Sequence, residues 1–171
     1  MEGKELKEEI LELWRGSERL SRMRTRGQSM EPLLQDGDEI EIRHSLPDPR
    51  IGDLILFSNS DGLVAHRVIG RRCKDGKALV LEKGDKSSQA SLISTSMIQG
   101  KFMRIFKPGK IIHLESPFPR VMGRIMAVYS LIGYGLLNKT PFRRHPKFVS
   151  NLSTFMLKLF TALMKRGKSP Q

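Results

Sequence analysis

The chain has 171 residues, 39% of them hydrophobic, and a formal net charge of +12 at pH 7. This length suits one folded domain with short additions, and it buries enough apolar surface to fold without disulfides or metals. The single cysteine, Cys73, excludes an internal disulfide. Scattered histidines and carboxylates predict no metal site, and the absence of a Walker-type loop or Gly-x-Gly-x-x-Gly pattern predicts no nucleotide cofactor.

The positive charge is concentrated in the C-terminal part. Residues 1–100 contain 16 Lys+Arg and 17 Asp+Glu, whereas residues 101–171 contain 14 Lys+Arg and one acidic residue, Glu115. This asymmetry indicates an anionic partner, either a membrane surface or nucleic acid. Nucleic acid is disfavoured because the basic part lacks the aromatic spacing of a single-strand platform, and because the Glu-rich residues 2–12 would repel phosphate.

The first 26 residues predict an amphipathic helix over residues 4–23 and a basic lead-in that ends at Arg26. The apolar residues that fall near one helical face are Leu6, Ile10, Leu13, Trp14 and Leu20. Such a helix either covers the following domain or contacts another protein. The Glu-rich start does not fit the apolar region of a signal peptide.

Residues 27–115 predict a β-rich domain. Asp53–Phe57 is a continuous apolar run, as expected of a strand buried on both faces. The other strand candidates are Asp38–Arg43, Leu63–Ile69, Lys77–Lys83, Met97–Phe106 and Lys110–Leu114. Turn signals at Asn59–Gly62 and Lys74–Gly76 predict hairpins. Short strands at close spacing favour a coiled, barrel-like antiparallel β fold.

Residues 116–171 predict a basic, apolar helical extension. Its apolar run Ile125–Leu137 is shorter than the roughly 20 residues that a membrane-spanning helix needs. A second segment, Phe148–Met164, has apolar residues at helical spacing. Residues 120–165 are therefore expected to bind an anionic membrane surface, which makes the protein membrane-associated. The alternative is a pair of helices packed on the core of a cytoplasmic protein.

Two residues fit nucleophilic chemistry. Ser29 lies in a turn rich in glycine and proline that leads into the strand at Asp38–Arg43, so its hydroxyl would be presented at a strand end. A serine hydroxyl needs an adjacent base, and a neutral imidazole is available near neutral pH. His66 is the best candidate base, although its strand alone favours a core histidine.

Six short motifs carry a resemblance to a known family. They occur in the order Gly27–Pro32, Gly37-Asp38, Ile51–Phe57, His66–Ile69, Lys83–Asp85 and Gly100-Lys101. Over about residues 25–105 the chain resembles the type I signal peptidase superfamily, which also includes self-cleaving LexA-type repressors. His66-Arg67-Val68 is similar to the archaeal and endoplasmic-reticulum branch, whose base is histidine. The resemblance implies that Ser29 attacks a peptide carbonyl while His66 takes the proton.

The chain departs from that pattern at two positions. The histidine branch has a further aspartate that orients the histidine, and the matching position here is Ser91. Asp85 is the candidate that takes this role, or else it caps a turn. Many signal peptidases also have a serine two residues before the nucleophile, where this chain has Gly27. The oxyanion would then rest on backbone N–H groups, chiefly that of Ser29.

The expected function is a serine endopeptidase that cleaves signal or leader peptides of a preprotein or a small modified peptide. One alternative is a non-catalytic peptide-binding module on the same fold. Another is a self-cleaving LexA-like regulator, which is disfavoured because residues 1–26 offer only the small pair Gly16-Ser17, within the predicted helix.

Overall fold

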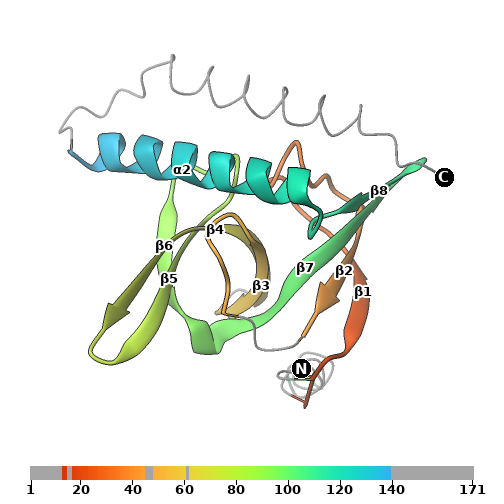
Figure 1. Cartoon of the computed structure of the whole chain (residues 1–171), viewed down its shortest axis with the longest axis horizontal. Coiled ribbons are helices and arrows are strands. Elements are labelled where there is room, and N and C mark those ends of the chain that lie inside the picture. Colours follow the sequence, from red (N-terminus) through yellow and green to blue (C-terminus); the bar gives the residue numbers. More distant parts are fainter. Residues whose placement is uncertain (1–12, 15–16, 45–47, 61, 140–171) are drawn as a thin grey trace.

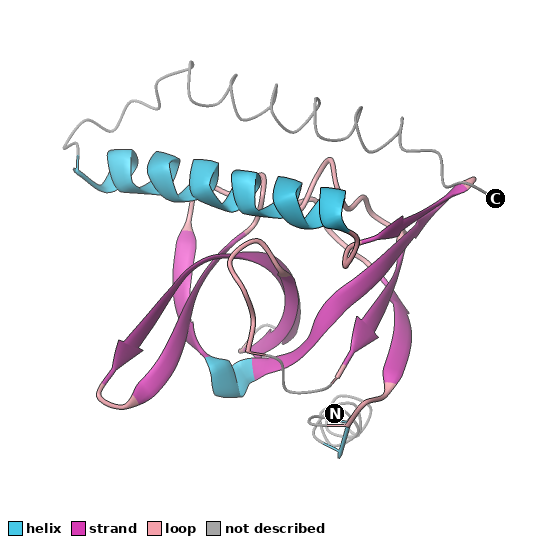
Figure 2. Cartoon of the chain, in the orientation of Figure 1, coloured by secondary structure: helices cyan, strands magenta, loops and turns pink. Residues whose placement is uncertain are grey.

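The computed structural model describes residues 13–14, 17–44, 48–60 and 62–139. These residues form an eight-stranded sheet that curls on itself, and a long helix, α2 (Pro117–Lys139), lies along one side of it (Figure 1). Figure 2 shows the predominance of strands over helices. The mainly β, curled antiparallel fold with a C-terminal helix agrees with the architecture expected from the sequence.

The sheet contains eight strands. Their bounds are β1 Leu20–Arg24, β2 Glu39–Arg43, β3 Leu54–Asn59, β4 Gly62–Lys74, β5 Lys77–Lys83, β6 Ala90–Ser94, β7 Ile98–Lys107 and β8 Lys110–His113, with a short 3-10 helix η1 at Thr95–Met97. The order across the sheet is β1-β2-β7-β3-β4-β5-β6, with β8 paired to β7. Every pairing is antiparallel.

The central strand β3 is buried on both faces, as its apolar run predicted. Residues 54–57 of this strand are each at most 3% exposed. Leu54 and Leu56 enter one hydrophobic cluster, whereas Ile55 and Phe57 enter a second. Successive side chains of a strand point to opposite faces, so β3 contributes to both clusters of the curled sheet.

The two predicted hairpins are confirmed. Asn59 pairs with Gly62 at the β3–β4 turn, and Lys74 pairs with Lys77 at the β4–β5 turn. In the second turn Asp75 and Gly76 have φ values of 52° and 72°. Positive φ at both central residues is what a tight hairpin turn of this twist requires, and it explains the Asp-Gly sequence.

The helix expected over residues 4–23 is wrong at its C-terminal end. Residues 20–24 form β1, which pairs with β2 in a register that places Met23 opposite Ile40. Side chains along β1 alternate between exposed and half-buried, as on a strand with one covered face. Residues 4–12 and 15–16 of the predicted helix lie outside the described residues.

Helix α2 packs closely on the sheet. Met122, Met126 and Ala127 are buried on its inner face, and a Cβ added to Gly123 would lie 2.8 Å from the carbonyl oxygen of Gly52. This contact brings the helix backbone against the loop before β3. No helix among the described residues is long and apolar enough to cross a membrane. The second apolar segment, Phe148–Met164, lies outside the described residues.

Candidate active site

The loop between β1 and β2 presents Ser29 to solvent. Met30, Leu33 and Leu34 of this loop are buried in the hydrophobic cluster beneath it. Two backbone bonds tighten the turn, from Glu31 N–H to the Gln28 carbonyl at 3.2 Å and from Leu34 N–H to the Met30 carbonyl at 3.0 Å. The buried side chains hold the loop in place, so the exposed Ser29 hydroxyl occupies a fixed position.

His66 lies on β4, opposite Ile55 of β3, and its Nε2 is 3.3 Å from Ser29 Oγ. The structure therefore brings together the serine and the histidine that the sequence singled out. The imidazole is 18% exposed and tilts against the ring of Phe57, with ring centroids 6.0 Å apart. A packed imidazole beside an exposed hydroxyl can accept the hydroxyl proton without first reorienting.

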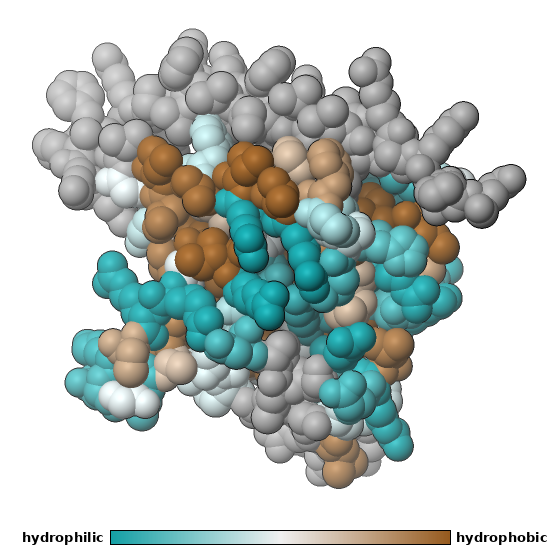
Figure 3. Space-filling model, in the orientation of Figure 1, coloured by the Kyte–Doolittle hydropathy of each residue, from teal (hydrophilic) through white to brown (hydrophobic). Residues whose placement is uncertain are grey.

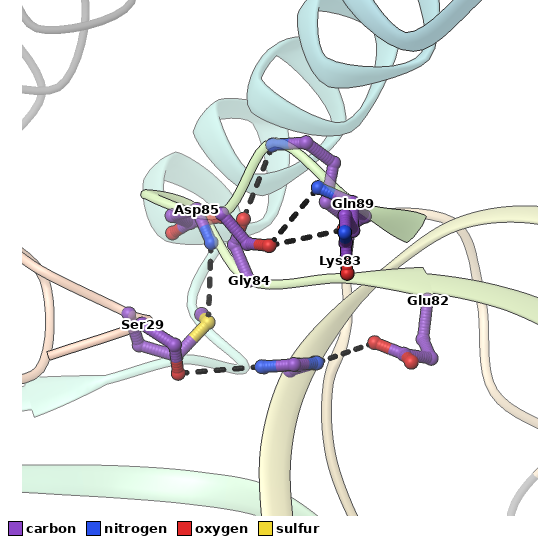
Figure 4. A network of polar contacts seen from close by, with 9 residues as sticks. Ser29, Glu82, Lys83, Gly84, Asp85 and Gln89 are labelled. Carbon is purple, nitrogen blue, oxygen red and sulfur yellow. Dashed lines mark hydrogen bonds and ion pairs between the residues drawn. The ribbon is translucent and has the colours of Figure 1, made fainter. Parts of the chain in front are cut away.

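A third side chain, which the sequence interpretation did not single out, contacts His66 at its other ring nitrogen. Glu82 Oε2 is 2.5 Å from His66 Nδ1, and the Glu82 side chain is 6% exposed (Figure 4). A carboxylate at Nδ1 favours the tautomer that carries its proton there. The Nε2 lone pair then faces Ser29. Ser29, His66 and Glu82 thus have the order of contacts of a serine–histidine–acid triad.

Asp85 does not orient His66, which corrects the expectation from the sequence. Both of its oxygens accept hydrogen bonds from Arg67, at 2.8 Å from Nε and at 2.7 Å from Nη2, and both side chains are buried. Arg67 follows His66 on β4, and neighbouring side chains of a strand point to opposite faces. Asp85 therefore pairs on the face of the sheet away from the imidazole.

The position at which the resemblance expects an aspartate lies beside Glu82. Ser91 on β6 is the direct cross-strand partner of Glu82 on β5. Direct partners in an antiparallel pair point to the same face. The carboxylate that contacts His66 therefore comes from the strand adjacent to the expected one.

Gly84 closes the site on one side. A Cβ added there would lie 2.9 Å from the carbonyl oxygen of Ser29 and 3.0 Å from Nε2 of His66. The next loop residues fix this close approach, because Lys86 N–H donates to the Ser29 carbonyl at 2.8 Å. A side chain at residue 84 would push apart the two groups whose proximity defines the site.

The Lys83 side chain makes no hydrogen bond with Ser29, His66 or Glu82. Its amine donates to the Gly84 carbonyl at 3.1 Å and is buried with the pair of Arg67 and Asp85. Burial lowers the pKa of the Lys83 amine; Asp85 opposes this shift and Arg67 adds to it. The geometry assigns Lys83 to bracing the Gly84 loop rather than to contact with Ser29.

The backbone N–H of Ser29 donates to no protein group within the described part of the chain, whereas the Ser29 carbonyl accepts from Lys86. Gly27 carries no side-chain hydroxyl, so the Ser29 N–H is the candidate oxyanion donor that the sequence interpretation named.

No family model, curated protein or solved structure matches the chain in sequence or fold comparisons. Among the described residues, no group of three or more His, Cys, Asp or Glu side chains is arranged to hold a metal ion.

Proposed function

We propose that the chain is a serine endopeptidase that cleaves signal or leader peptides. Ser29 is the nucleophile, His66 the general base, and Glu82 the residue that orients His66. The observation that carries the proposal is that His66 contacts both other side chains, Ser29 through Nε2 at 3.3 Å and Glu82 through Nδ1 at 2.5 Å.

The proposed reaction has two halves. Ser29 Oγ attacks the peptide carbonyl carbon while His66 Nε2 takes the hydroxyl proton. When the C–N bond breaks, His66 gives that proton to the leaving amine, and an acyl ester remains on Ser29. Water then attacks the ester with His66 again as base, and the acid product leaves as the Ser29 hydroxyl is restored.

The burial of the three side chains supports these roles. Ser29 is exposed to a substrate, His66 is half-buried, and Glu82 is buried. A buried carboxylate beside the imidazole stabilises the imidazolium that forms when His66 is protonated, because the surroundings screen little of their attraction. Glu82 replaces the aspartate that the resemblance expects at residue 91, with a longer side chain reaching from the adjacent strand.

The substrate class follows from the resemblance to signal peptidases. Members of that superfamily usually prefer small residues just before the cut. A leader with small residues just before the cut is accordingly the proposed substrate.

Peptide digestion tests the proposal. Purified wild-type protein is incubated with a panel of leader and signal peptides, and the products are identified by mass spectrometry. We expect cleavage by the wild type and a loss of at least about a thousandfold in Ser29→Ala and in His66→Ala. Ser88→Ala, an exposed serine beyond Gly84, serves as the matched control and should cleave normally.

Three results would contradict the proposal in different ways. Cleavage that survives in Ser29→Ala would exclude this nucleophile. Peptide binding without cleavage by the wild type would favour the binding module. Cleavage confined to the chain itself would favour the self-cleaving regulator.

A further inference from the structure

Helix α2 is apolar on two faces. Its inner face packs on the sheet through Met122, Met126 and Ala127. On the other side, six large apolar side chains are 41–57% exposed and form what we call the outer stripe: Phe118, Val121, Ile125, Val128, Leu131 and Ile132. Figure 3 shows apolar surface gathered along the helix.

The spacing of these residues makes the stripe continuous. Phe118, Val121, Ile125, Val128 and Ile132 follow one another at intervals of three or four residues, which places them along one line of the helix. A contiguous apolar surface rimmed by polar groups marks an interaction site in a folded protein. The outer stripe is therefore a candidate interaction surface.

The charges around the stripe identify the chemistry of that partner. Helix α2 contains Arg120, Arg124 and Lys139 and no acidic residue. Arg124 is exposed and lies three residues after Val121 and four before Val128, so its guanidinium borders the stripe. Apolar side chains bordered by basic ones match the boundary between the acyl chains and the phosphates of an anionic bilayer.

The same charges disfavour two alternative partners for the stripe, a second copy of the chain and the chain's own C-terminal segment. A second copy would bring a second basic helix, and like charges placed face to face repel. The chain beyond α2 would also bring only positive charge, because the charged residues among residues 140–171 are all Lys or Arg. An anionic lipid surface offers the opposite charge to both.

We propose that the outer stripe of α2 docks the protein on an anionic lipid surface, with the helix lying in the plane of the interface. The 23 residues of α2 would lie along about 34 Å of that surface. Arg124 would face lipid phosphates while the outer stripe enters the acyl boundary. This inference does not depend on the proposed peptidase activity, because docking needs no substrate.

Vesicle flotation with the full-length chain tests the docking. We expect the wild type to float with vesicles of equal parts phosphatidylcholine and phosphatidylglycerol, and much less with phosphatidylcholine alone. Val121→Ser/Val128→Ser should lower the partition coefficient by about tenfold for each valine at full burial. Arg124→Gln should lower it about fivefold on the anionic vesicles only. Leu92→Ser/Ile111→Ser removes two side chains of similar exposure on the sheet and should float normally.

A fluorescent reporter locates the contact. Trp14 is the only tryptophan. Trp14→Phe/Val128→Trp therefore carries one indole on the outer stripe, and Trp14→Phe/Leu92→Trp carries one on the sheet. Brominated lipids should quench the first and not the second.

Four results would overturn the proposal. The wild type could fail to float, or Val121→Ser/Val128→Ser could float like the wild type. The reporter at residue 128 could show a buried emission before vesicles are added and no quenching afterwards, which would mean that the chain itself covers the stripe. A dimer that dissociates in Val121→Ser/Val128→Ser without any flotation would assign the stripe to a second copy.

Discussion

At the scale of single residues, the site depends on how closely the Gly84 loop approaches Ser29 and His66. Ser29 accepts a backbone hydrogen bond from Lys86 at 2.8 Å, and the glycine between Lys83 and Asp85 leaves room for the imidazole. The hydroxyl and the imidazole are then held at 3.3 Å, within reach of proton transfer. Small displacements here should affect turnover before they affect folding.

Gly84→Ala tests this close approach. The added methyl group would lie 3.0 Å from His66 Nε2 and 3.1 Å from Ser29 Cβ, so one of the two must move. We expect kcat to fall about tenfold, because the overlap displaces the reacting groups by only part of the roughly 1 Å that costs about a hundredfold. Gly70→Ala is the control, since its methyl would meet only carbons of Leu81 at 3.5 and 3.6 Å. Wild-type kcat in Gly84→Ala would show that the loop is not constrained.

The Asp85→Asn variant tests whether the Asp85 carboxylate has a structural role or a catalytic one. Asp85 neutralises the buried Arg67 guanidinium, so removing its charge should lower the free energy of unfolding by about 3 kcal/mol in urea denaturation. The folded protein should keep kcat within about tenfold, because the His66–Glu82 contact stays intact. If Asp85→Asn keeps its stability but its kcat falls as far as that of His66→Ala, Asp85 would belong with the proposed catalytic residues.

The sequence singled out two of the three contacting residues. Ser29 follows from its turn and His66 from its motif. Glu82 does not, because its contact with His66 depends on the register of β4 against β5. That register shifts at a bulge between Val68 and Gly70. A bulge is set by tertiary packing and twist, so the alternation of the two strands does not reveal which side chains meet.

At the scale of elements, two ion pairs of Glu115 hold the start of α2 against the sheet. Glu115 accepts from Lys101 of β7 at 2.7 Å and also pairs with Arg120 of α2. Burial acts to raise the pKa of Glu115, but the hydrogen bonds from Lys101 and Arg120 outweigh it and hold the pKa below its ordinary value of 4.5. These ion pairs link the helix to β7, the neighbour of the central strand β3.

Glu115→Gln should therefore destabilise the fold in a pH-dependent way. A carboxyl whose pKa is lower in the folded chain stabilises it above its ordinary pKa, and this contribution is lost as the pH falls through the folded value. Because Glu115 is only partly shielded from water, the loss at neutral pH should be at most about 1 kcal/mol. Urea titrations at neutral and acidic pH measure it.

The difference from the wild type should shrink as the pH falls below 4.5. Glu39→Gln, which breaks a more exposed pair with Arg22 inside the sheet, is the control. A Glu115→Gln deficit that persists unchanged in acid would exclude the ionised carboxylate as its source.

The elements that the sequence missed are those with little apolar signal. The spacing of Leu13, Trp14 and Leu20 predicts a helix that includes the residues of β1, whereas in the structure only Ser21 and Met23 of β1 are partly covered. β6 has one buried residue, Ile93, and its other large apolar side chain, Leu92, is exposed. Both strands lie at the edges of the sheet, where pairing with a neighbouring strand decides the conformation. The buried β3 and the turns at its side were predictable from local pattern alone.

At the scale of the whole molecule, α2 links the proposed lipid surface to the site. On its inner face Gly123 meets the Gly52 carbonyl, which accepts a hydrogen bond from Arg67 at 2.9 Å. Arg67 in turn holds Asp85, next to Gly84. A continuous set of contacts therefore joins the helix that carries the outer stripe to the proposed catalytic residues.

A peptide tethered to anionic vesicles should accordingly be cleaved faster than the same peptide in solution. Docking concentrates enzyme and substrate on one surface, so the advantage requires no change in the site. Val121→Ser/Val128→Ser should lose the advantage and keep its rate on the soluble peptide. An equal advantage in this variant would show that docking on α2 does not bring the enzyme to its substrate.

The measurement that tests the triad most directly is kcat/KM for wild type, Glu82→Ala and Glu82→Ala/Ser91→Asp on one cleaved peptide. Ser91 is the cross-strand partner of Glu82, so an aspartate there restores a carboxylate on the same face of the sheet. We predict that Glu82→Ala lowers kcat/KM by about ten-thousandfold, as loss of an orienting carboxylate does in serine peptidases, and that Ser91→Asp recovers part of it. Unchanged kcat/KM in Glu82→Ala would contradict the assignment of Glu82, and with it the proposed triad.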